Sequence, residues 1–289
     1  MPIKVTKPLI PDKSIFNKYV EQIFESKQLT NAGPLNKKLT DDLKKLLSVK
    51  NLVLTCNGTA SIRTMLACLD YDPYRNEIIV PSFTFVATIS SIVACGYRPI
   101  FVDILENNGT IDPKSVENAI SEKTAAIMGV HCYGNPCDNY QLEKIARKAK
   151  LYLFYDAAHA FGVIQNGESI LNWGDASALS FHATKIFSTC EGGAIVSEND
   201  EFVINSEIYI NNGMQKSYSD FVIKKLGMNA KLSEINAAFG LAILDKVDNS
   251  IEERKIIYEY YVNEFKQITE HLIPYLDCKN CTHNFSYAP

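Results

Sequence analysis

Apolar and polar positions form two different patterns along this chain. Leu35, Leu39, Leu43, Leu46 and Leu47 recur at helical spacing with charged residues between them, which predicts an amphipathic helix. Short runs that are apolar at nearly every position follow, and helical stretches separate them. Strands of that kind are buried on both faces. The alternation therefore predicts an α/β fold with a mostly parallel sheet in a three-layer arrangement, covered by helices on both sides.

The predicted elements alternate over the first two thirds of the chain. The strands are Asn51–Thr55, Glu77–Val80, Arg98–Val102, Thr124–Val130, Leu151–Tyr155, Ala176–Phe181 and Gly193–Ser197. The helices are a stretch from the Asn57-Gly58-Thr59 turn to Leu69, Thr84–Gly96, Pro113–Ile120 and Tyr140–Lys150. After about residue 231, apolar positions from Ile235 to Phe265 predict one long helix or a kinked pair. The remainder is too short for a core of its own.

Composition and charge exclude several classes of protein. Hydrophobic residues make up 46% of the 289 positions and charged residues 21%, so the chain can bury a sizeable core. The net charge is −4, from 29 basic and 33 acidic residues, and this argues against nucleic acid as a partner. Residues 1–11 contain no apolar signal core, and no run approaches ~18 apolar residues. We therefore expect a cytoplasmic protein that is neither secreted nor membrane-spanning.

The eight cysteines predict neither a metal site nor a disulfide framework. Most lie inside apolar runs, where cysteine behaves as a small core residue. Cys278 and Cys281 have the spacing of a metal or redox motif, but no second pair accompanies them. We therefore expect reduced thiols and no bound metal. The histidines His131, His271 and His283 are assigned to core or surface packing.

Two turns at predicted strand ends could bind a ligand. Asn57-Gly58-Thr59 opens a helix, and the free N–H groups and positive dipole end of a helix suit a phosphate. The same three residues could equally be an ordinary helix cap. Phe85 follows the second predicted strand, where its ring could stack on a planar ligand or pack in the core. Each signal alone is weak.

Two further strand ends carry charged side chains. Asp156 ends its strand and is followed by small residues, so it either contacts a ligand or caps the next turn. Lys185 follows a buried strand and precedes a Gly-Gly turn, a place where desolvation would favour the neutral, nucleophilic amine. Pyridoxal phosphate requires a lysine, a carboxylate for its ring nitrogen, a phosphate cup and a ring cover. All four lie at strand ends of this chain, so they predict that cofactor together.

Six motifs resemble one enzyme family across essentially the whole chain. They belong to the sugar-nucleotide aminotransferases of the DegT/DnrJ/EryC1/StrS group, which are pyridoxal-phosphate enzymes of fold type I. The motifs are Leu29-Thr30-Asn31-Ala32-Gly33-Pro34, Asn57-Gly58-Thr59, Pro81-Ser82-Phe83-Thr84-Phe85-Val86-Ala87-Thr88, Asp156-Ala157-Ala158-His159-Ala160, Ser180-Phe181-His182-Ala183-Thr184-Lys185 and Gly227-Met228-Asn229-Ala230-Lys231.

This resemblance implies a role for each candidate residue. Lys185 would bind the cofactor covalently and carry the proton between the donor's Cα and C4′ of the cofactor. Asp156 would pair with the pyridinium nitrogen, and Phe85 would cover the ring. Gly58, Thr59 and Ser180 would hold the phosphate.

Two further positions concern the partner subunit and the ring oxygen. The resemblance implies that Asn229 reaches the phosphate of a partner subunit, so that a homodimer with shared active sites is required for activity. His159 stands where many relatives carry Gln, near the cofactor's phenolic oxygen. This departure leaves its role open, since histidine can both donate a hydrogen bond and titrate.

The resemblance also narrows the substrate. The motif ending in Lys185, together with Glu191-Gly192-Gly193 and the Asn229 motif, is most similar to the branch that aminates dTDP-4-keto-6-deoxyglucose at C4, with glutamate as donor. Relatives that aminate C3 share most of these motifs and stay an alternative. A second alternative is a non-catalytic, cofactor-binding regulator on the same fold. A sugar-dehydrating relative would carry histidine in place of Lys185, and a Rossmann-type domain would require a Gly-x-Gly-x-x-Gly motif that this chain lacks.

Chain length bears on the domain organisation that the resemblance implies. We expect a large cofactor domain over residues 1–245, which includes an N-terminal helical segment. Residues 246–289 would begin a smaller α+β domain. Such enzymes usually continue for about another 80 residues, so this second domain is expected to be incomplete and the chain truncated.

Overall fold

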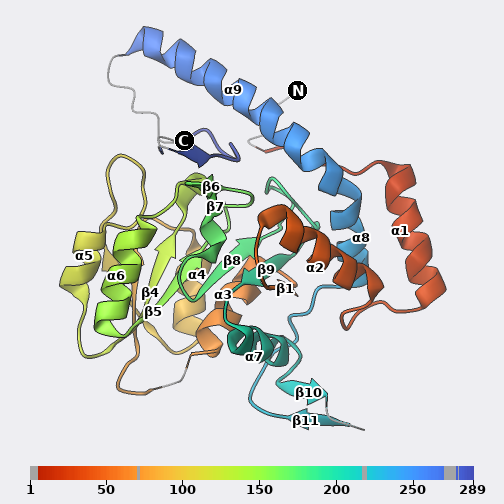
Figure 1. Cartoon of the computed structure of the whole chain (residues 1–289), viewed down its shortest axis with the longest axis horizontal. Helices are drawn as coiled ribbons and strands as arrows, with labels where there is room; N and C mark the ends of the chain where they lie inside the picture. Colours follow the sequence, from red (N-terminus) through yellow and green to blue (C-terminus); the bar gives the residue numbers. More distant parts are fainter. Residues whose placement is uncertain (1–5, 70–71, 217–219, 270–277, 279) are drawn as a thin grey trace.

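The core of the protein is a seven-stranded sheet, seen in a computed structural model that describes residues 6–69, 72–216, 220–269, 278 and 280–289 (Figure 1). The strand order is β1-β9-β8-β5-β4-β2-β3. β9 runs antiparallel to both of its neighbours, whereas the pairs from β8 to β3 are all parallel. The strands are β1 (Leu52–Thr55), β2 (Glu77–Pro81), β3 (Arg98–Val102), β4 (Thr124–Val130), β5 (Tyr152–Asp156), β8 (Ala176–Ser180) and β9 (Gly193–Val196). The predicted α/β class with a mostly parallel sheet is confirmed.

Helices cover both faces of this sheet and short strands lie outside it. The helices are α1 (Lys13–Ser26), α2 (Pro34–Leu47), α3 (Gly58–Ala67), α4 (Val86–Ala94), α5 (Pro113–Ala119), α6 (Asn139–Ala149), α7 (Asp200–Ile210), α8 (Glu234–Ile243) and α9 (Val247–Ile268), with short 3₁₀ turns η1 (Cys132–Gly134), η2 (Ile170–Asn172) and η3 (Leu244–Lys246). The outlying strands are β6 (Ile164–Gln165), β7 (Glu168–Ser169) and β12 (Cys281–Thr282) in one group and the hairpin β10 (Met214–Lys216) and β11 (Phe221–Ile223) in another.

Alternating side chains of the strands divide the core into layers. Ile78 and Val80 of β2 pack with α3, α4 and α7 on one face of the sheet. Ile79, between them in sequence, packs with α5 and α6 on the opposite face. The rest of that second face, over β1, β9 and β8, is covered by α2 and α8. Burial on both faces explains why the strands contain so few polar residues.

The boundaries of the predicted elements agree with the structure to within two residues. Thr84–Gly96 was expected as a helix, but α4 begins at Val86, because Phe85 is its extended N-cap residue. The kinked-pair alternative holds for the segment after residue 231, since η3 separates α8 from α9. The patterns did not predict α1, α7 or the hairpin, all of which have mixed or exposed apolar positions.

One buried carboxylate connects the N-terminal helices to the rest of the core. Glu234 is 1% exposed, and its two oxygens accept hydrogen bonds from the backbone N–H groups of Leu35 (2.8 Å) and Asn36 (3.1 Å) at the start of α2. A carboxylate here satisfies two donors that lack partners within the helix and interacts favourably with the helix dipole. A Cβ atom on Gly33 would lie 2.6 Å from the Glu234 carboxyl carbon, so only glycine fits before Pro34.

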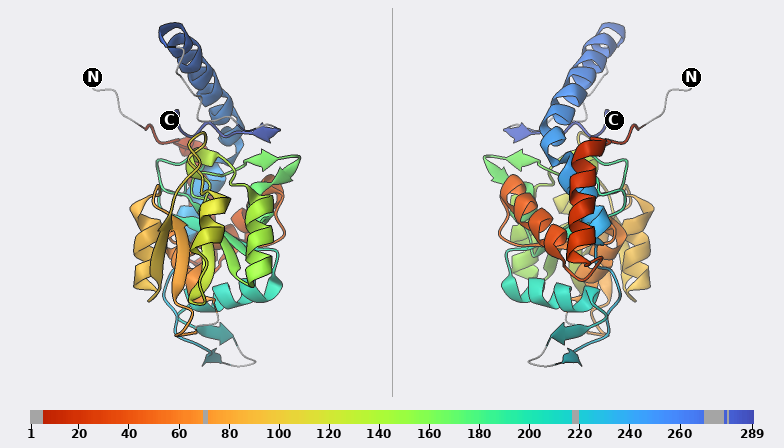
Figure 2. Two further views of the ribbon diagram at one scale, coloured as in Figure 1. Left: turned by 90° about the vertical axis from the view of Figure 1, so that its left-hand side faces the viewer. Right: turned by 90° about the vertical axis from the view of Figure 1, so that its right-hand side faces the viewer.

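Helix α9 and the hairpin β10–β11 project from opposite ends of the molecule (Figure 2). Only Val247 is buried among the described residues of α9. Among the helices within the described ranges, none has an apolar stretch long enough to cross a membrane. After α9, β12 pairs antiparallel with β6 in a separate three-stranded sheet, β12-β6-β7.

The expectation of reduced thiols is wrong for one pair of cysteines. Cys278 and Cys281 form a disulfide, with Cα atoms 5.6 Å apart. Asn280 between them has a positive φ of 60°, so the backbone turns back and brings the two side chains together. The other six cysteines are free, and all eight lie within the described ranges. Of the three unassigned histidines, His131 is fully buried and His283 partly buried, whereas His271 lies outside the described residues.

The contact between Glu234 and α2 leads to a stability prediction. Glu234→Ala leaves two buried N–H donors unpaired and is expected to lower the free energy of unfolding by about 2–4 kcal/mol. Glu234→Gln keeps one acceptor oxygen and is expected to cost less. Urea unfolding followed by circular dichroism measures both. Glu201→Ala, at an exposed position in the first turn of α7, is the matched control and should change stability by at most about 0.5 kcal/mol. A Glu234→Ala variant as stable as the control would contradict the anchoring role.

Candidate active site

A cavity of about 560 Å³ opens at the carboxyl ends of the parallel strands. This is where ligands bind in open α/β sheets, and the volume lies in the range of small-molecule sites. Seven of the eight candidate residues line it: Gly58, Thr59, Phe85, Asp156, His159, Ser180 and Lys185. The eighth, Asn229, lies elsewhere.

The proposed phosphate cup forms where three strand ends meet. Gly193 begins β9 and lies between Thr55 of β1 and Ser180 of β8 in the sheet register. A Cβ atom on Gly193 would lie 2.7 Å from the backbone carbon of Asn57, and one on Gly58 would lie 2.9 Å from the Cβ atom of Ser180. The two glycines therefore allow the start of α3 to approach the Ser180 side chain.

The start of α3 offers hydrogen-bond donors to an anion. Helix α3 begins at Gly58, and the Asn57 side chain accepts a hydrogen bond from the N–H group of Ala60 (2.8 Å). The cap reading of this turn is therefore correct. It is also compatible with phosphate binding, because one side-chain cap satisfies one of the four N–H groups that a helix N-terminus leaves open. The hydroxyls of Thr59 and Ser180 line the same part of the cavity.

Asp156 is held rigidly at the end of β5. Its Oδ2 atom accepts a hydrogen bond from the Thr88 hydroxyl (2.6 Å), and Oδ1 accepts one from the N–H group of Ala158 (3.1 Å). Burial raises the pKa of this carboxyl, while the two hydrogen bonds and the nearby charge of Lys185 oppose that shift. A cation placed against this carboxylate would stabilise its ionised form.

Lys185 lies in the loop between β8 and β9. Burial lowers the pKa of its ammonium group, and the charge of Asp156 opposes this shift. The fraction of neutral amine is therefore larger than for a lysine in water, as a nucleophilic lysine requires. Its Nζ atom donates a hydrogen bond to the Tyr287 hydroxyl at 3.4 Å.

His159 is a neutral hydrogen-bond donor in this environment. Its Nδ1 atom accepts a hydrogen bond from the Tyr133 N–H group (3.2 Å), so the ring proton resides on Nε2. Burial and the charge of Lys185 lower the pKa of His159 to about 3. Its ring lies parallel to that of Tyr133, with centroids 5.8 Å apart. With its pKa this far below 7, His159 stays neutral near neutral pH.

Phe85 stands at the open side of the cavity. It is 71% exposed, so it is not a core residue of the described chain. Phe83 lies nearby and packs edge-on against Tyr133, with ring centroids 6.1 Å apart. An exposed aromatic ring at a cavity rim is available to cover a planar ligand, which agrees with the role expected for Phe85.

The donor set of this cavity fits pyridoxal phosphate. It combines an anion cup of backbone N–H groups and hydroxyls, a buried carboxylate that forms no ion pair with any described residue, and a desolvated lysine. Sequence reasoning gave no role to three residues that take part in this arrangement. Thr88, which orients Asp156, was contained in a recognised motif, whereas Tyr133 and Tyr287 had no signal in the local pattern.

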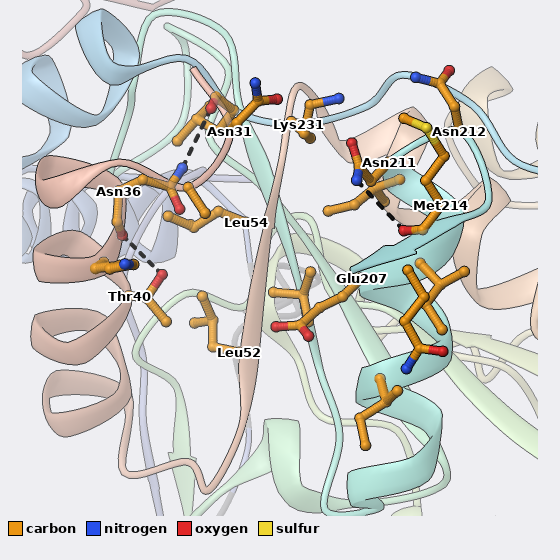
Figure 3. Close-up of a pocket in the computed structure, with 18 of the residues that line it drawn as sticks. Asn31, Asn36, Thr40, Leu52, Leu54, Glu207, Asn211, Asn212, Met214 and Lys231 are labelled. Carbon is orange, nitrogen blue, oxygen red and sulfur yellow. Dashed lines mark hydrogen bonds between the residues drawn. The ribbon is translucent and has the colours of Figure 1, made fainter. Parts of the chain in front are cut away.

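Asn229 lies outside the cavity, next to a second and larger one. It is exposed, pairs with Asn211 in an isolated β-bridge, and accepts a hydrogen bond from Lys231 Nζ (2.7 Å). Asn211 and Lys231 line a cavity of about 1130 Å³ between α2 and α7 (Figure 3). The structure of a single chain therefore does not bring Asn229 to the other seven residues.

Comparison with known proteins finds relatives that match nearly the whole chain. The chain is 43% identical to a dTDP-4-amino-4,6-dideoxy-D-glucose transaminase of Shigella dysenteriae, over all of this chain and 77% of that protein. It is 37% identical to the transaminase of the same name from Escherichia coli, over 99% of this chain and 76% of the relative. The solved structure of DesI, determined in the presence of its TDP-sugar product, superposes with a TM-score of 0.88 at 30% identity, covering 99% of this chain and 71% of DesI.

The family assignment rests on a match over nearly the whole sequence. Residues 12–288 match the DegT/DnrJ/EryC1/StrS aminotransferase family. The enzymes of this family use pyridoxal phosphate, in agreement with the donor set of the cavity described above. This chain belongs to the DegT/DnrJ/EryC1/StrS family of pyridoxal-phosphate-dependent aminotransferases.

Proposed function

We propose that this aminotransferase transfers an amino group from L-glutamate to C4 of dTDP-4-keto-6-deoxyglucose, giving dTDP-4-amino-4,6-dideoxyglucose. The observation that carries the proposal is the 43% identity, over the entire chain, to a transaminase named for that product. The product would serve surface-polysaccharide (O-antigen) or deoxysugar biosynthesis. A cytoplasmic location is part of this proposal.

The residues of the cavity have distinct tasks in this reaction. When bound, pyridoxal phosphate supplies an electron sink that stabilises negative charge on the carbon next to the reacting nitrogen. Asp156, fixed by Thr88 and Ala158, would hold a proton on the ring nitrogen and so strengthen that sink. The Lys185 amine would hold the cofactor by condensing with its aldehyde, with loss of water, and once released it would carry the proton between Cα of the donor and C4′.

The remaining residues bind and orient the cofactor. Gly58 and Thr59 at the start of α3 and Ser180 at the end of β8 would hold the phosphate through backbone N–H groups and hydroxyls. His159 would donate a hydrogen bond from Nε2 to the phenolic oxygen, and Phe85 would cover the ring. Because the pKa of His159 is about 3, its donor proton is present throughout the neutral range.

A homodimer with shared active sites is part of the proposal. In a single chain, Asn229 does not line the cofactor cavity, so it would serve a phosphate in another subunit. The adjoining hairpin supports such a contact, because Phe221, Ile223 and Leu226 are 61%, 76% and 93% exposed. Apolar side chains that water surrounds in one chain are typical of an interface between chains.

We also propose a domain boundary at residues 245/246. The boundary falls within η3, after which α9 leaves the core. Residues 1–245 would form the cofactor domain, and residues 246–289 would belong to a smaller one.

The substrate assignment is tested by a panel of nucleotide-linked keto-sugars. The purified protein is incubated with pyridoxal phosphate, L-glutamate and either 4-keto or 3-keto dTDP-6-deoxyglucose, and products are identified by mass and NMR. We expect turnover of the 4-keto sugar to exceed that of the 3-keto sugar by at least about 10²-fold in kcat/KM, since a misplaced carbonyl loses the alignment with the proton carrier. Preference for the 3-keto sugar would identify a C3-aminating enzyme. No turnover of any keto-sugar would favour the non-catalytic regulator.

The covalent role of Lys185 is tested by borohydride reduction of the holoprotein. We expect the wild type to show a cofactor absorbance band that borohydride fixes to the chain, and Lys185→Ala to lose both the band and at least about 10³-fold of the activity. Lys148→Ala, at an exposed site paired with Glu117, is the control and should behave as the wild type. Retention of a reducible band in Lys185→Ala would show that another residue binds the cofactor.

The shared-site role of Asn229 is tested by mixing two defective variants. Lys185→Ala and Asn229→Ala homodimers are each expected to be impaired, because each lacks one group in both sites. Subunit exchange at equal amounts gives heterodimers with one complete site, so activity should recover to about a quarter of the wild-type value. No recovery, with exchange verified by native mass spectrometry, would place Asn229 in the site of its own chain.

A further inference from the structure

The segment after α9 returns to the large domain and is fixed there by several polar contacts. Cys281 and Thr282 pair with Gln165 and Ile164 of β6. Asn284 is 1% exposed, and its Nδ2 atom donates hydrogen bonds to the carbonyl oxygens of His159 (2.8 Å) and Phe161 (2.9 Å).

Two more contacts give the end of this segment a defined conformation. The Asn284 Oδ1 atom accepts a hydrogen bond from the Ser286 N–H group (3.1 Å). The guanidinium of Arg254 on α9 donates one to the Ser286 carbonyl oxygen (3.1 Å). The backbone on both sides of Asn284 is thus fixed to the loop that follows Asp156 and to α9.

These anchors place the side chain of Tyr287 in the cofactor cavity. Its hydroxyl accepts the hydrogen bond from Lys185 Nζ at 3.4 Å, and the same nitrogen lies 5.7 Å from the centre of its ring. The Tyr287 ring also packs against His159, with centroids 4.6 Å apart, and against Tyr133 at 5.5 Å. Tyr287 therefore contacts both the lysine and the histidine of the proposed chemistry.

We propose that Tyr287 is a positioning residue that holds the ε-amino group of Lys185 in the cavity whenever that group is not bound to the cofactor. The inference rests on the role proposed above for Lys185. A lysine side chain has four rotatable bonds, so a free amine loses its direction unless an acceptor fixes it. Tyr287 supplies an acceptor oxygen and a ring face, both of which attract an ammonium group.

The groups around Lys185 show how the hydroxyl oxygen and the ring of Tyr287 each affect the protonation of Lys185. Asp156 and His159 face the lysine from the end of β5 and the loop after it, and Arg254 lies behind Tyr287 on α9. Burial raises the pKa of Tyr287, so its hydroxyl is a neutral acceptor in the neutral range. The oxygen then stabilises the ammonium form of Lys185, while the bulk of the ring excludes water and favours the neutral amine.

These two effects have opposite signs and can be separated by substitution. In the cofactor-free protein, the modification of Lys185 by acetic anhydride is followed against pH by mass spectrometry. Tyr287→Phe removes only the acceptor oxygen, so we expect the midpoint of the profile to fall by ~0.5–1 pH unit, with ~3–10-fold faster modification below it. Tyr287→Ala also admits water, so its midpoint should rise above that of Tyr287→Phe.

A second variant tests whether the anchored segment, residues 281–287, holds Tyr287 against Lys185. Asn284→Ala lies outside the contact with Lys185 but releases the segment, so its profile should match that of Tyr287→Ala, with a midpoint above that of Tyr287→Phe. Tyr258→Phe is the matched control, because Tyr258 packs against Phe285 of the same segment, with ring centroids 5.5 Å apart, and its profile should match the wild type. Circular dichroism verifies that each variant is folded.

The readout is independent of the sugar substrate. A wild-type profile for folded Tyr287→Phe would overturn the proposal, because a residue that only fills space would not sense the loss of one oxygen. A profile for folded Asn284→Ala that matches the wild type and differs from that of Tyr287→Ala would show that the segment does not hold Tyr287 in place, and would overturn it as well. Failure of the proposed amination would appear in the keto-sugar panel and leave these profiles unaffected.

Discussion

The close approach of three strand ends at Gly193 is the constraint on which the active site depends. The antiparallel strand β9 inserts between β1 and β8, and its first residue must pass the Asn57–Gly58 backbone with no room for a Cβ atom. Because of this, the start of α3 and the Ser180 side chain face one another across a single cavity. A reversed strand in an otherwise parallel sheet thus does more than complete the core. It brings together groups from strands that are not neighbours.

Within that cavity, Asp156 and Lys185 can carry opposite charges, and burial alone favours the neutral form of each. Burial raises the pKa of Asp156 and lowers that of Lys185, and each partly offsets the shift of the other. A cationic ring nitrogen placed beside Asp156 would favour the ionised carboxylate and would offset its attraction for the ammonium form of Lys185. The protein part of the site is therefore electrostatically complementary to a cationic ring. His159, fixed as a neutral donor by the Tyr133 backbone, adds no charge to this balance.

Much of the architecture could be predicted from sequence, because the strands are apolar on both faces and the helices between them are amphipathic. Seven of the candidate residues converge as expected, since the carboxyl ends of parallel strands share one edge of the sheet. The prediction failed where long-range contacts decide the structure. The pairing of β9 with β1, the hydrogen bonds that Glu234 accepts from α2 and the return of Tyr287 to Lys185 join positions that are far apart in sequence. The disulfide between Cys278 and Cys281 depends on a turn at Asn280 that the spacing alone did not indicate.

The pairing of β12 with β6 has a consequence for how the protein folds. Asn284 bonds to carbonyl groups 125 and 123 residues earlier in the chain, after the excursion of α9. Closing so long a loop costs conformational entropy that only a formed docking surface repays, so the sheet must be assembled before this segment can bind. During synthesis, the β-strands that carry Asp156 and Ser180 leave the ribosome more than a hundred residues before Tyr287. Tyr287 therefore joins the cavity last of its lining residues, after the strands and loops that carry the others.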